Sequence, residues 1–149
     1  MMNVFINPGH ALGGNPDPGC VNQAENLREC DIALTVGSIM GKFLEEAGCT
    51  VSLLQSHNLG GESPAYPNVT DTANHSLADA FISIHVNAGG GRGAETFCYW
   101  RYGAGGRLAA SIQNPLVYGK SLLWTFGKWH KGKERRRNAK ISYTSCPRR

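Results

Sequence analysis

The sequence of 149 residues lacks several features that define whole classes of protein. It contains no run of about 18 apolar residues, which excludes a bilayer-embedded protein. Its five cysteines are odd in number and include no Cys-x-x-Cys pair. This pattern argues against a cysteine zinc knuckle, a thioredoxin-type redox pair and a full disulfide framework. We therefore expect reduced thiols and a single core held by packing, which a chain of this length can bury.

The first residues, MMNVFINPGH, show no leader. They contain neither a basic segment nor a long apolar segment and pass directly into a strand-like run. We therefore expect synthesis in the cytoplasm without a signal peptide. Any action outside the cell would then need another route of delivery.

Charge is distributed unevenly, although the net charge is only +4. Residues 1–114 contain 5 basic and 10 acidic side chains, whereas residues 115–149 contain 10 basic side chains and the single acid Glu134. We therefore divide the chain into a globular part, 1–114, and a basic tail, 115–149. Such a tail can bind phosphates, but no helix-turn-helix, zinc-finger or RNP pattern accompanies it, which argues against a nucleic-acid-binding protein.

Hydrophobic periodicity predicts alternating strands and helices in the first part. Apolar runs typical of strands occur at about 4–6, 50–54, 80–85 and 94–100. Apolar residues at helical spacing occur at about 25–47, 70–78 and 106–114. Gly48 is expected to end the first helix, and Asn68 or Thr70 to cap the second. The alternation predicts an α/β protein with a mixed, largely parallel sheet and helices on both faces.

Two histidines follow predicted strands, at the sheet edge where α/β proteins form their sites. His10 comes after the first strand and a Pro-Gly turn, and His85 ends the FISIH strand. Glu25, near the start of the first long helix, is a third candidate at this edge. Two imidazoles and one carboxylate suit zinc and leave a fourth position for water, as in catalytic sites. Either histidine alone could be structural, but the pair favours a metal site.

Four segments resemble, in order, the motifs of the zinc-dependent N-acetylmuramoyl-L-alanine amidases. NPGHALGGNPDPGCV resembles the first histidine motif and D-P-G turn of that family, and ENLRECDIA resembles its ligand glutamate and first long helix. LADAFISIHVNAG resembles its second histidine motif, and GAETFCYW its Gly-x-E-T strand. The resemblance covers the chain from about Val4 to Tyr102.

This resemblance implies zinc ligands at His10, Glu25 and His85. Glu29, one helical turn further on, is the rival for the carboxylate, and the Ile32-Ala33 pair that follows favours Glu25 in the alignment.

The resemblance also implies a substrate and a reaction. The substrate is peptidoglycan, and zinc would activate water to hydrolyse the amide between N-acetylmuramic acid and L-alanine, as in autolysins and endolysins. Asn87 is expected to contact substrate, with capping of the adjacent loop as the alternative. Asp17 is expected to shape its loop through an Asx-type hydrogen bond.

The resemblance ends where the charge changes. The family carries a second essential carboxylate in a C-terminal motif like V-E-x-G-F-x-S-N, which is absent here; Glu134 lies in KGKERRR instead, so no acid/base residue is assigned. A frame shift, a truncation or an appended arm that binds anionic wall polymer would each explain the tail. We expect weak hydrolysis, a missing strand and self-association through the uncovered sheet. The alternative function is a zinc-containing wall-binding module without catalysis, and a third, less favoured, is a nucleic-acid-binding protein that acts through its basic tail.

Overall fold

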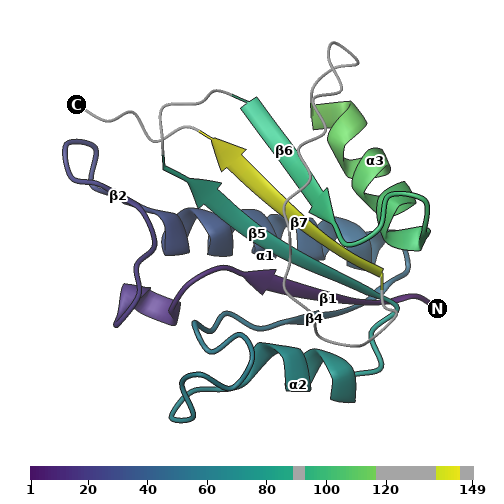
Figure 1. Cartoon of the computed structure of the whole chain (residues 1–149), viewed down its shortest axis with the longest axis horizontal. Coiled ribbons are helices and arrows are strands. Elements are labelled where there is room, and N and C mark those ends of the chain that lie inside the picture. The colour runs from purple at the N-terminus through teal and green to yellow at the C-terminus, as the bar shows by residue number, and fades with distance from the viewer. Residues whose placement is uncertain (89–92, 117–136, 145–149) are drawn as a thin grey trace.

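The computed structural model describes residues 1–88, 93–116 and 137–144, the last of these by its backbone. Its centre is a five-stranded sheet in the order β4-β1-β5-β7-β6 (Figure 1). The strands are β1 (Asn3–Pro8), β4 (Thr50–Leu53), β5 (Ala80–Asn87), β6 (Gly93–Cys98) and β7 (Arg137–Thr144). Four of them run parallel, and β6 is antiparallel to β7. The predicted mixed, largely parallel sheet is confirmed.

Helices cover both faces of this sheet. They are α1 (Glu29–Glu46), α2 (Val69–His75) and α3 (Ala104–Leu116). Side chains of α1 and α3 pack on one face, around Ile6, Ile82 and Ile84. On the opposite face α2 packs against Phe5 and Phe81. The three layers agree with the prediction, and no helix among the described residues is both long and apolar enough to cross a membrane.

The first long helix begins later than residue 25, where we expected its start. After β1 come a short 3-10 turn, η1 (Leu12–Gly14), and a two-stranded ribbon of β2 (Val21–Asn22) and β3 (Leu27–Arg28). Only then does α1 begin, at Glu29. Glu25 therefore lies in the exposed turn of the ribbon instead of on a helix.

Strand β7 comes from the segment that we assigned to the basic tail. Its backbone pairs with β5 along Ala80–Asn87 and with β6 along Gly93–Cys98. The sheet therefore continues where a missing strand was expected, and that expectation is wrong. The division at residue 114 and self-association stay predictions, because residues 117–136 and 145–149 lie outside the described part.

Candidate metal centre

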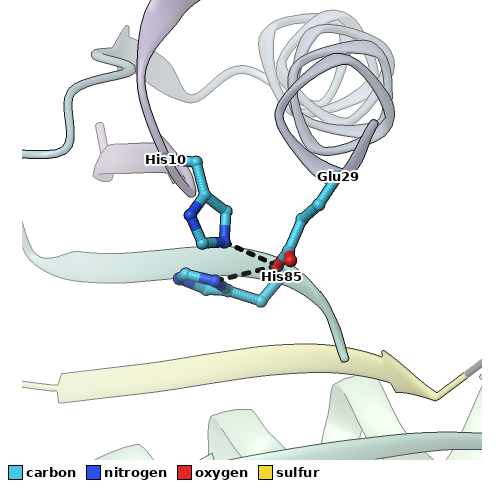
Figure 2. Close-up of side chains that lie close together, drawn as sticks. All are labelled: His10, Glu29 and His85. Atoms are coloured by element: carbon cyan, nitrogen blue, oxygen red, sulfur yellow. Dashed lines mark hydrogen bonds and ion pairs between the residues drawn. The ribbon is translucent and has the colours of Figure 1, made fainter. Parts of the chain in front are cut away.

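Three side chains meet at the carboxyl edge of the parallel strands: His10, Glu29 and His85 (Figure 2). Nε2 of His10 lies 2.9 Å from Oε1 of Glu29, and Nδ1 of His85 lies 3.1 Å from the same oxygen. One ligand atom from each residue falls within 4.8 Å of the other two. The three groups therefore surround a point that one small cation can occupy.

Each of these side chains comes from the end of a different element. His10 follows β1 with a φ of +70°, Glu29 is the first residue of α1, and His85 lies near the end of β5. The N–H of Gly9 donates to the carbonyl oxygen of Ile84 at 2.8 Å, which ties the end of β1 to β5. The neighbouring parallel strands thus bring both histidines to the same edge.

Hydrogen bonds hold both oxygens of the buried Glu29. Oε1 accepts from the N–H of Val86 at 2.7 Å, and Oε2 accepts from the N–H of Cys20 at 3.0 Å. Burial by itself would raise the pKa of Glu29, but its contacts with His10, His85 and these N–H groups outweigh burial and hold the pKa well below its usual range. The carboxylate is therefore charged at neutral pH, as a metal ligand must be.

Asp17 orients the ring of His10. Its Oδ2 lies 2.8 Å from Nδ1 of His10, and its Oδ1 accepts from the N–H of Gly19 at 3.1 Å. The Gly19 bond is the predicted Asx-type contact; the contact with His10 was not predicted. Glu29, and to a smaller extent Asp17, raise the pKa of His10 above 6.5 despite burial. We assign the Nδ1–H tautomer from the contact with Asp17, which leaves the Nε2 lone pair facing the centre.

The surroundings of Nε2 of His10 are those expected for an atom that binds a metal ion. The atom is buried and makes no hydrogen bond of good geometry within the described residues, although Oε1 of Glu29 is close by. When the ring of His10 is neutral with its proton on Nδ1, both its Nε2 and Oε1 of Glu29 can only accept hydrogen bonds, and the two atoms face each other. A cation between them would satisfy both. Two imidazole nitrogens and a carboxylate are a donor set that zinc takes. The residues present therefore fit zinc.

Two glycines allow the backbone to pass close to the three clustered side chains. A Cβ on Gly9 would lie 2.4 Å from Cε1 of His85. A Cβ on Gly19, whose φ is +69°, would lie 2.6 Å from Cδ2 of His10 and 2.7 Å from Cβ of Glu29. Any larger residue at either position would displace one of the three clustered side chains.

The carboxylate that joins the histidines differs from the predicted one. Glu29, the rival, stands with the histidines, whereas Glu25 is exposed and its N–H donates to Oδ1 of Asn22 at 3.3 Å. The placement of Glu25 in this cluster was therefore wrong. The apolar spacing starts only at Ile32. That start puts Glu29 in the first helical turn and was the signal that could have separated the two.

Asn87 lies at the end of β5, two residues beyond His85, and its Nδ2 donates to Oε1 of Glu95 at 2.9 Å. Its contact with substrate stays a prediction. Glu134 lies outside the described residues.

The sequence model of the N-acetylmuramoyl-L-alanine amidases matches residues 4–136. The chain belongs to this family. The sporulation-specific N-acetylmuramoyl-L-alanine amidase of Bacillus subtilis (strain 168) is 36% identical over 104 residues, which are 70% of this chain and 38% of that protein. The germination-specific N-acetylmuramoyl-L-alanine amidase of the same organism is 30% identical over 127 residues, 76% of this chain and 52% of that protein. The chain thus spans about two fifths to one half of the length of these relatives.

Solved amidase structures share the fold. The N-acetylmuramoyl-L-alanine amidase AmiC2 of Nostoc punctiforme superposes with a TM-score of 0.71 at 24% identity, over 94% of this chain and 77% of that chain. The family match also runs beyond residue 114, to residue 136, and so crosses the boundary that we drew from charge.

Proposed function

We propose that this amidase domain hydrolyses the amide between N-acetylmuramic acid and L-alanine in peptidoglycan, with zinc held by His10, Glu29 and His85. The observation that carries the proposal is the cluster of two half-buried histidines and the buried Glu29 at the sheet edge, in a chain that belongs to the amidase family. The proposal requires that the chain reaches the cell wall, where this substrate lies.

The chemistry follows from the donor set. A zinc ion would act as a Lewis acid, which lowers the pKa of a bound water to about 7 and polarises a carbonyl. The two imidazoles offer neutral nitrogen donors, and Glu29 offers one negative charge. Asp17 holds the ring of His10, and the N–H groups of Cys20 and Val86 hold Glu29. These outer contacts fix the ligands before any ion arrives, which favours affinity.

A wall-binding zinc module without hydrolysis is the second candidate. It is favoured by the sequence of β7, RNAKISYT, which contains no carboxylate. The family resemblance would place an acid/base glutamate in the C-terminal part of the domain. A domain without such a group would bind zinc and wall but turn over slowly, because acid/base assistance contributes about 10²–10⁴-fold to rate.

Digestion of purified peptidoglycan by the zinc-loaded chain distinguishes these candidates. We expect new N-terminal alanine and no new reducing sugar ends, and we expect His85→Ala to abolish the release. New reducing ends would indicate a glycosidase, which uses two carboxylates at the sugar bond. Retention of the chain on the walls without release of alanine would support the binding module.

A further inference from the structure

Glu95 of β6 lies on the same face of the sheet as His85. The register pairs His85 with Ser142 of β7, and Ser142 with Glu95. Residues paired across a sheet point to the same face. The next residue on β6 supports this orientation, since Thr96 donates to Gln113 of α3 at 2.7 Å and therefore faces the opposite side.

Asn87 fixes the carboxylate of Glu95. It lies two residues beyond His85, hence on the same face, and its Nδ2 donates to Oε1 of Glu95 at 2.9 Å. Both side chains are half-buried. The bond spans the intervening strand β7 and joins Glu95 to the strand that carries a proposed zinc ligand. The carboxylate is thus tied to β5, at a residue two positions along that strand from His85.

The spacing fits an amide between the two groups. His85 and Glu95 are separated by one intervening strand, so their Cα atoms are about 10 Å apart, twice the usual strand spacing. Both side chains rise from the same face of the sheet, and the ring of His85 contacts Glu29 and His10 there. An amide whose carbonyl approaches the histidine cluster would therefore have its nitrogen on the Glu95 side.

We propose that Glu95 is the general acid/base of this amidase, in place of a carboxylate on β7; this inference rests on the proposed function. Glu95 accepts one proton from water as the water oxygen bonds to the carbonyl carbon. It then delivers that proton to the amide nitrogen as the C–N bond breaks. The products are the lactyl carboxylate and the α-amine of L-alanine, which takes up the second water proton. Asn87 acts as a positioning residue that keeps Glu95 in place.

The test compares Glu95→Gln with wild type in the zinc-loaded chain, on a soluble muropeptide that contains the N-acetylmuramoyl-L-alanine bond. Gln keeps the shape of the side chain and an oxygen that accepts from Asn87, so we expect unchanged zinc content and thermal midpoint. We expect kcat to fall about 10²–10⁴-fold, the usual contribution of acid/base catalysis. Formate should restore part of the activity of Glu95→Ala, an effect that a merely structural role would not produce.

Two controls separate the alternatives. Glu46→Gln, which removes one carboxylate at the far end of α1, should leave the rate unchanged, and so should Glu134→Gln. Full activity in Glu95→Gln, or its loss in Glu134→Gln instead, would overturn the inference and leave the proposed function standing. Loss of zinc or of the folded state in Glu95→Gln, with no formate rescue of Glu95→Ala, would make Glu95 structural. A zinc-loaded wild-type chain that releases no alanine would overturn the proposed function and this inference together.

Discussion

At the scale of single residues, we propose that Glu29, and not Glu25, is the carboxylate that binds zinc. Glu29→Gln retains an oxygen for only one of the two N–H groups that hold this side chain, and it removes the charge that a cation needs. We expect its zinc affinity to fall by at least about 100-fold, the upper end of what loss of an outer partner costs. Glu25→Gln makes the same chemical change in the exposed ribbon turn and should bind like wild type. Elemental analysis after dialysis and competition with a chromogenic chelator measure both, and equal affinities would contradict the assignment.

The sequence predicted that His10 and His85 meet at one edge, but it favoured Glu25 over its rival Glu29 and missed the contact of Asp17 with His10. His10 and His85 follow strands, and the ends of adjacent parallel strands share an edge, so a local pattern was enough. The choice of Glu25 overlooked that the apolar spacing starts only at Ile32, and the ribbon that precedes α1, with two residues per strand, has no periodicity of its own. The contact between Asp17 and His10 depends on the path of a whole loop, which no spacing rule describes.

At the scale of elements, the loop between β1 and α1 is expected to tolerate alanine at Gly13 but not at Gly19. Both glycines have a φ near +70°, so alanine costs a similar backbone strain of about 1–2 kcal/mol at each. A Cβ on Gly13 meets nothing within 4 Å, whereas on Gly19 it meets His10 and Glu29. Gly19→Ala should therefore also lose zinc affinity, and Gly13→Ala should keep it. Thermal unfolding and zinc titration of both variants check this, and wild-type affinity in Gly19→Ala would contradict it.

The ends of the helices were predictable from the sequence where a single capping residue determines them. Gly48 follows α1 with a φ of +85°, and Asn68 caps α2 by accepting from the N–H of Asp71 at 3.0 Å, both as expected. β7 was missed because RNAKISYT is mostly polar or charged and has no apolar run. Its extended form is specified by pairing with strands on either side, and such tertiary pairing leaves little trace in the sequence of the segment.

At the scale of the whole molecule, β7 decides whether the chain is one unit or a domain with an arm. The other four strands lie on either side of it, β4-β1-β5 on one side and β6 on the other. Within the described sheet, β6 pairs with β7 alone, and α3 contacts both of these strands. The metal centre lies on the other half, on β1, α1 and β5. The two halves of the sheet are therefore joined through a strand from the basic tail.

A chain that ends at Arg136 tests this organisation. Without β7, β6 loses its backbone partner, α3 loses part of its support and one side of β5 loses its hydrogen bonds. We expect the shortened chain to show a lower midpoint and a smaller denaturant m value, since less surface is buried on folding. A chain that ends at Thr144 keeps the strand and is the matched control. If the chain ending at Arg136 unfolds with the midpoint and m value of the full chain, the basic segment is an appended arm and the domain ends near residue 114 after all.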